Sequence, residues 1–183
     1  VVFQRPPSTV DVRDNRPTDP EWAASREPGW QRELMDNFLE VLSGEPVETS
    51  LVTDGWTKTP NLQREIISGS FSETTDTELE DAQTMNRIRA RVDEVVDDPE
   101  TAAKLKPWYR YMCKRPGFSD TYLPAFNRPN VRLADTADTH GITALTETAV
   151  VVGDDEYELD CLAFATGLEV GVSGVVSGTL PVS

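Results

Sequence analysis

Apolar residues recur at helical spacing in two long stretches of the chain. The first, over residues 31–43, consists of Leu34, Phe38, Val41 and Leu42, and Gly44 is expected to end that helix. The second begins near residue 77 and repeats at threes and fours. Its members are Leu79, Ala82, Met85, Ile88, Val92, Val95 and Val96. Each stripe predicts one helix with a single apolar face.

Two further helices are predicted to begin at an Asp-Pro-Glu triplet. Asp19 and Asp98 can each cap the free N–H groups of a first turn, the proline suits the first helical position, and the glutamate complements the helix dipole. Pro28 interrupts the earlier helix and Pro107 follows the later one. A short helix is also predicted over residues 63–67.

Three arginines lie among the apolar positions of the second long helix. Because Arg87, Arg89 and Arg91 are flanked by acidic residues, we expect them on a solvated face rather than in a basic site. The segment from about residue 20 to 106 is therefore expected to be an acidic helical block without chemistry of its own.

Short strand-like runs lie outside this helical block. Residues 1–4 form one that two prolines stop, and residues 130–134 predict another. Residues 149–152 lead through a Gly-Asp-Asp turn into a return strand. Residues 161–165 are apolar throughout, which is typical of a central parallel strand buried on both faces. The order of strand, helical insertion and strands predicts an α/β fold with an inserted helical subdomain.

Charge and composition narrow the function classes. A net charge of −15 over 183 residues argues against nucleic acid or an anionic membrane as partner, and nothing approaches a transmembrane run. Cys113 and Cys161 form no CxxC pair, so no metal or disulfide framework is predicted and a reducing, cytoplasmic compartment is expected. The chain opens on an apparent strand without an initiator methionine, and we expect it to be part of a longer protein.

The candidate chemistry lies in residues 106–131, which are rich in aromatic residues and proline. Repeated prolines exclude a long helix and stiffen the segment. Here the adjacent cations Lys114 and Arg115 could hold anionic oxygens; the alternative is a basic surface loop whose aromatic residues serve the core. Arg5 ends the first predicted strand, a place where α/β proteins commonly accept the 2′-phosphate of NADP.

Four motifs follow one another along the chain. They are Phe-Gln-Arg-x-Pro-Ser at 3–8, Lys-Arg-Pro at 114–116, Tyr-Leu-x-x-Phe-Asn-Arg-Pro-Asn-Val at 122–131 and Glu-Leu-Asp-x-Leu-x-Phe-Ala-Thr-Gly at 158–167. In this order they resemble the motifs of the Baeyer–Villiger monooxygenases. The resemblance implies an FAD- and NADPH-dependent flavoprotein that uses O2 to convert ketones to esters or lactones. Residues 11–20 are most similar to the branch that acts on bulky or polycyclic ketones.

The resemblance also implies roles for particular residues. Arg5 matches the arginine that holds the 2′-phosphate of NADPH, and Lys114 matches a lysine that faces the same phosphate and ribose. Arg115 matches the catalytic arginine, which lies over the flavin beside the nicotinamide. Thr166 and Gly167 match the cofactor-binding stretch where the chain passes from the NADPH domain back towards the FAD domain.

The implied layout is part of a Rossmann-like NADPH-binding domain with a helical insertion, within a flavoprotein of two dinucleotide-binding domains. Residues 1–18 and 107–167 would belong to the NADPH-binding domain, 19–106 to its insertion, and 168–183 to an irregular tail beyond the resemblance. Neither glycine-rich dinucleotide loop is in the chain, so it is expected to be inactive without the missing FAD domain. Pro6 stands where the family usually has threonine, which removes a hydroxyl and an N–H.

Two alternative functions stay open on the sequence. One is a related flavin monooxygenase that oxidises nitrogen or sulfur, although the context of Lys114 and Arg115 favours the Baeyer–Villiger enzymes. The other is a non-catalytic acidic interaction domain derived from such an enzyme. That alternative predicts no saturable response to NADPH or FAD.

Overall fold

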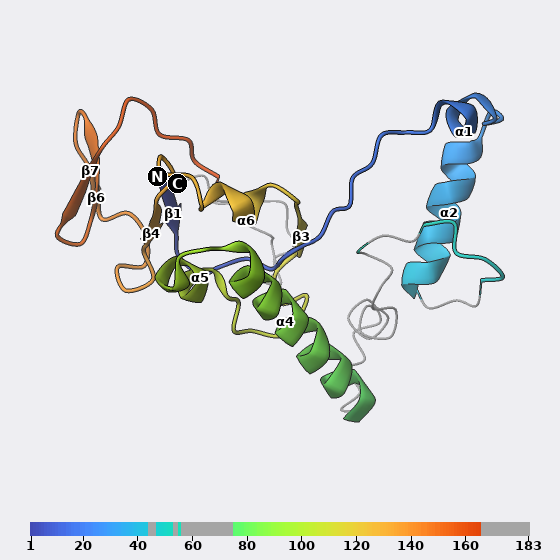
Figure 1. Cartoon of the computed structure of the whole chain (residues 1–183), viewed down its shortest axis with the longest axis horizontal. Coiled ribbons are helices and arrows are strands. Elements are labelled where there is room, and N and C mark those ends of the chain that lie inside the picture. The colour runs from blue at the N-terminus through green and yellow to red at the C-terminus, as the bar shows by residue number, and fades with distance from the viewer. Residues whose placement is uncertain (44–46, 53–54, 56–74, 166–183) are drawn as a thin grey trace, which may run out of the picture. The chain divides into compact units, whose positions relative to one another are not determined.

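A computed structural model describes residues 1–43, 47–52, 55 and 75–165 of the chain (Figure 1). It divides into two units, Val1–Gly141 and Ile142–Ser183, and each is described by itself. The elements of the first unit are β1 Val2–Gln4, β2 Val10–Asp11, α1 Pro20–Ala24, α2 Trp30–Ser43, α4 Thr75–Val95, α5 Pro99–Leu105, β3 Gly117–Phe118, α6 Tyr122–Ala125 and β4 Leu133–Asp135. The second unit contains β5 Ala144–Leu145, β6 Ala149–Val152 and β7 Asp155–Glu158.

The predicted helix starts are confirmed. The Asp19 carboxylate accepts a hydrogen bond of 2.9 Å from the backbone N–H of Glu21 at the start of α1. Asp98 accepts one of 2.8 Å from Thr101 at the start of α5, and hydrogen bonding to Thr101 lowers the pKa of the Asp98 carboxyl. The predicted stop at Gly44 and the predicted helix over 63–67 lie outside the described residues.

Two parallel strand pairs join distant parts of the first unit. β1 pairs with β4, with Val2 opposite Leu133, and β2 pairs with β3, with Val10 opposite Gly117. The predicted strand over 130–134 is thus shifted towards the carboxyl end, since β4 begins at Leu133. This mixture of helices and parallel strands is consistent with the predicted α/β class.

Helix α4, the long green helix of Figure 1, lies at the centre of two apolar clusters. The first joins it to α5 and α6 and consists of Val92, Val96, Ala102, Leu105, Leu123 and Phe126. The second consists of Met85, Ile88 and Tyr111. The predicted stripe was wrong at its amino-terminal end, because Ala82 is exposed and Leu79 is 54% exposed. Among the described elements, none covers the side of α4 that carries Leu79 and Ala82.

The second unit contains the predicted hairpin. β6 pairs antiparallel with β7 and with β5, giving the order β5-β6-β7. Val152 pairs with Asp155, so Gly153 and Asp154 form a two-residue turn, and Gly153 takes a φ of 61°. Such a turn needs a positive φ at its first central position, which glycine adopts without strain.

The prediction of a buried strand over residues 161–165 was wrong. These residues form no strand, Cys161 is exposed and the Phe164 side chain is 67% exposed. An apolar run becomes a central strand only where neighbouring strands accept its backbone hydrogen bonds, and none of the strands in the described part of the chain pairs with it. None of the described helices is both long and apolar enough to span a bilayer.

Candidate functional site

Arg5 and Lys114 are far apart in the sequence, but the positive charge of Arg5 acts on the Lys114 ammonium in the structure. Arg5 directly follows β1, and Lys114 lies three residues before β3. Burial lowers the pKa of the Lys114 ammonium from its ordinary value of 10.5, and the positive charge of Arg5 lowers it further. Two like charges are therefore brought into one neighbourhood, where an anion would relieve their repulsion.

Tyr109 joins the segments that carry these two cations. Its hydroxyl donates a hydrogen bond of 2.9 Å to the carbonyl of Pro7 and accepts one of 3.1 Å from the N–H of Thr9. The Lys114 ammonium lies 5.3 Å from the centre of the Tyr109 ring. Burial raises the pKa of Tyr109, so the hydroxyl keeps its proton at neutral pH and remains able to donate.

Arg115 lies between Lys114 and the buried Pro116, and its own side chain is exposed. Within the described part of the chain its guanidinium makes no hydrogen bond or ion pair. The following backbone is fixed, because the N–H of Gly117 donates 2.9 Å to the carbonyl of Thr9. Arg115 therefore offers its donors from an anchored chain segment.

The aromatic residues of 106–131 divide between core and surface. Tyr111 and Phe126 are buried, as the alternative of a surface loop with core aromatics expects. Trp108, in contrast, is 76% exposed, and the Arg89 guanidinium lies 4.5 Å from the centre of its ring. Burial raises the pKa of Tyr111 to about 12.

The arginines of α4 are partly exposed, as the predicted solvated face requires, but they also hold distant parts of the chain, which was not predicted. Arg87 makes a bidentate ion pair with Asp11, with hydrogen bonds of 2.7 and 2.6 Å. Arg91 donates to the carbonyls of Val10 and Ser119 at 3.0 and 3.1 Å. Guanidinium groups suit such roles because they offer several donors in a fixed plane.

A sequence signal for this role was available in part. Arg87 and Arg91 are four residues apart, a spacing that puts them on one face of a helix. That face borders the buried residues Ile88 and Val92 rather than lying opposite them. The identity of their partners, however, depends on a contact between segments distant in sequence.

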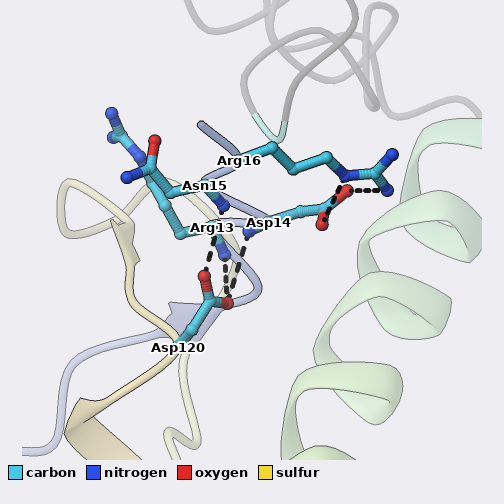
Figure 2. Close-up of polar contacts among 5 residues, drawn as sticks. All are labelled: Arg13, Asp14, Asn15, Arg16 and Asp120. Carbon is cyan, nitrogen blue, oxygen red and sulfur yellow. Dashed lines mark hydrogen bonds and ion pairs between the residues drawn. The ribbon is translucent and has the colours of Figure 1, made fainter. Parts of the chain in front are cut away.

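The Asp120 side chain, which was not predicted to have a role, holds the chain just after β2 (Figure 2). The Asp120 carboxylate accepts backbone hydrogen bonds from Arg13, Asp14 and Asn15 at 2.9, 3.3 and 3.4 Å. These bonds, that from Arg13 first, lower the pKa of Asp120. Asp14 has a φ of 50°, which turns successive N–H groups towards one carboxylate.

Two predicted cofactor-binding residues, Thr166 and Gly167, lie outside the described residues. Cys113 and Cys161 are free thiols and both are exposed. In the ranges that the structure describes, no group of His, Cys, Asp or Glu side chains could hold a metal ion. The described candidate site therefore consists of Arg5, Lys114 and Arg115, supported by Tyr109.

Two curated proteins are similar to almost the whole chain. A Baeyer–Villiger monooxygenase from Streptomyces coelicolor is 58% identical over 188 residues, which cover 99% of this chain and 31% of that protein. Neopentalenolactone D synthase from Streptomyces avermitilis is 51% identical over 174 residues, covering 92% and 29%. The resemblance to the Baeyer–Villiger monooxygenases is confirmed. The chain spans less than a third of the length of these two relatives.

Solved structures agree with the match to Baeyer–Villiger monooxygenases. A polycyclic ketone monooxygenase from Thermothelomyces thermophila matches with a TM-score of 0.69 and 43% identity, over 86% of this chain and 27% of that one. A cyclohexanone monooxygenase with bound ε-caprolactone matches with a TM-score of 0.64 and 28% identity, over 91% and 35%. No protein-family model matches the chain.

Replacing Arg5 by alanine is expected to raise the pKa of Lys114. The variant removes a positive charge that disfavours the ammonium, but burial still lowers the pKa, so the value should rise without reaching 10.5. An NMR titration that follows the Lys114 side chain measures this change. The matched control is Arg128→Ala, which removes another exposed cation and should leave the pKa of Lys114 unchanged. An identical Lys114 titration in the wild type and Arg5→Ala would contradict the shared site.

Proposed function

We propose that this chain forms part of the NADPH-binding region of a Baeyer–Villiger monooxygenase, which converts ketones to esters or lactones with O2, NADPH and FAD. The proposal rests on the 58% identity to an enzyme of that name over almost the whole chain. The match to a polycyclic ketone monooxygenase at 43% identity favours a bulky or polycyclic ketone as substrate. The FAD-binding part would come from sequence that this chain does not contain.

The observation that supports the assignment of the site is the proximity of Arg5 to Lys114, since burial and then the positive charge of Arg5 lower the pKa of that ammonium. This brings two positive charges together in a chain whose net charge is −15. The described residues give neither side chain an ion-pair partner. A guanidinium and an ammonium around one site fit the oxygens of a phosphate group, and the 2′-phosphate of NADPH is the group we assign to them.

Arg115 is assigned to the reacting end of the cofactors. FAD, when bound, supplies the oxygen chemistry, and the protein has to stabilise negative charge there. An arginine side chain offers several N–H donors in one plane, so Arg115 can donate hydrogen bonds to an anionic oxygen and to the ketone oxygen as charge develops on it. A lysine would be a poorer choice, because burial lowers the pKa of an ammonium, as it does at Lys114.

The finer architecture is also part of the proposal. Residues 1–18 and 107–167 would form the later part of a Rossmann-like NADPH-binding domain, and 19–106 its helical insertion. Residues 168–183 lie outside the described residues. The parallel pairings β1 with β4 and β2 with β3 support this division, because each joins the first segment to the third. We assign Thr166 and Gly167 to cofactor binding at the return to the FAD domain.

NADPH is expected to bind this chain more tightly than NADH, by about tenfold for each lost charge-assisted contact. Titration of the two nucleotides against wild type, Arg5→Ala and Lys114→Ala measures the preference, and each variant should reduce it. Arg115→Ala is the matched control, since it removes a neighbouring cation that is not assigned to the 2′-phosphate. Equal affinity of the wild type for both nucleotides would refute the assignment and favour a non-catalytic domain.

The assigned role of Arg115 predicts a split between two half-reactions. In the complete flavoenzyme, Arg115→Ala should lower ester formation by about a hundredfold or more, because a preorganised donor to a developing oxyanion is lost. Reduction of the flavin by NADPH should continue at a measurable rate. Stopped-flow absorbance of the flavin and product analysis by gas chromatography separate the two. Ester formation at the wild-type rate would remove Arg115 from the reaction.

A further inference from the structure

The segment that carries Lys114 and Arg115 is fastened at both ends to helix α4. On its amino-terminal side, Arg89 donates 3.0 Å to the carbonyl of Pro107, and the Asp81 carboxylate accepts 2.7 Å from the N–H of Tyr111. On its carboxyl-terminal side, Arg91 donates 3.1 Å to the carbonyl of Ser119. The same helix therefore fixes where the segment begins and where it ends.

Helix α4 also holds the carboxyl-terminal end of this segment indirectly, through strand β2. The Asp11 side chain is only 4% exposed and is held by both terminal nitrogens of Arg87. Asp11 in turn accepts a hydrogen bond of 2.9 Å at its backbone carbonyl from the N–H of Ser119, next to β3. Arg91 bridges the same two strands, because it contacts the carbonyls of both Val10 and Ser119. β3 begins two residues after Arg115, so the position of α4 is transmitted to that residue.

Between these anchors the chain forms an exposed arch. Tyr111 and Pro116 are buried, whereas Cys113 and Arg115 are exposed and Lys114 is half-buried. Met112 takes a φ of 64°, a left-handed conformation that turns the chain outward after Tyr111. The described structure gives the Arg115 side chain no hydrogen bond, so the position of this residue is set only through the anchored backbone at the two ends of the arch.

We propose that Arg87 and Arg91 of helix α4 are positioning residues, which set the arch of residues 112–115 so that Lys114 and Arg115 face the nucleotide; this inference rests on the proposed function. The arginines touch no bound group themselves and act through Asp11, Val10 and Ser119. A helix of the acidic insertion thereby acts on the chemistry of a distant loop.

The test compares local order with nucleotide preference in the full chain. The double variant Asp11→Asn/Arg87→Met removes both charges of the pair and leaves no unpaired ion at the buried position 11, so the fold should persist. Arg91→Ala removes the second bridge independently. Hydrogen exchange followed by NMR should show the amides of Gly117 and Ser119 exchanging at least about tenfold faster in both variants. The amide of Val96, in the neighbouring helix core, should exchange at the wild-type rate.

The preference for NADPH over NADH is the readout that a merely structural role would leave unchanged. It should fall at least about threefold in Arg91→Ala and in the double variant, and Arg87→Lys should retain part of it because the charge remains. Lys104→Ala, which breaks a surface ion pair with Glu100 on α5, is the matched control. It should change neither the exchange rates of the Gly117 and Ser119 amides nor the preference for NADPH.

Folded variants with wild-type exchange at Gly117 and Ser119, or with an unchanged preference, would overturn the proposal. If the double variant fails to fold, Arg91→Ala and Arg87→Lys decide the question alone. Hydrogen exchange needs no nucleotide. A wild-type chain without any NADPH preference would therefore refute the proposed function, while the exchange rates would still decide whether α4 orders the arch.

Discussion

The ion pair between the buried Asp11 carboxylate and the half-exposed Arg87 guanidinium is the constraint on which the candidate site depends. Removing a carboxylate from water is costly unless both of its oxygens are paired, and a bidentate guanidinium at 2.6 and 2.7 Å meets that need. The pair fixes β2 against α4, and β2 fixes β3 through parallel pairing. Tyr109 holds the loop after β1 through hydrogen bonds between its hydroxyl and the backbone of Pro7 and Thr9. Loops without regular structure are thereby given defined positions.

This arrangement explains how an acidic chain can present a cationic site. Some of its described cations have a local carboxylate, as Lys104 has Glu100 on one turn of α5. Arg5 and Lys114 form no ion pair within the described residues, and their segments are brought together by strand pairing and by Tyr109. An anionic ligand bound between Arg5 and Lys114 would offset the electrostatic repulsion between these two cations. A site of this kind is selective for a phosphate over an uncharged hydroxyl.

Features that depend on neighbours in sequence could be predicted, and those that depend on distant partners could not. The caps at Asp19 and Asp98 and the hairpin turn at Gly153 follow from a few consecutive residues, and the structure confirms them. The motifs around Arg5 and Lys114 predicted two cations of one site. The positive charge of Arg5 contributes to the lowered pKa of Lys114, and the assignment of both to a nucleotide stays a prediction. The role of Arg87 was missed because its acidic neighbours suggested a solvated face. Its partner, Asp11, lies on strand β2, far from α4 in the sequence. The run over 161–165 was misjudged because burial needs partner strands, which composition alone does not supply.

The most direct test of the central claim is an NMR titration of the chain with 2′-AMP and, separately, with 5′-AMP. The two ligands have the same base, sugar and charge and differ only in the position of the phosphate. We expect 2′-AMP to shift the resonances of Arg5, Tyr109 and Lys114 in a saturable way, and 5′-AMP to shift them far less at the same concentration. Equal shifts from both ligands, or shifts confined to other residues, would contradict the account of Arg5 and Lys114 as a 2′-phosphate site.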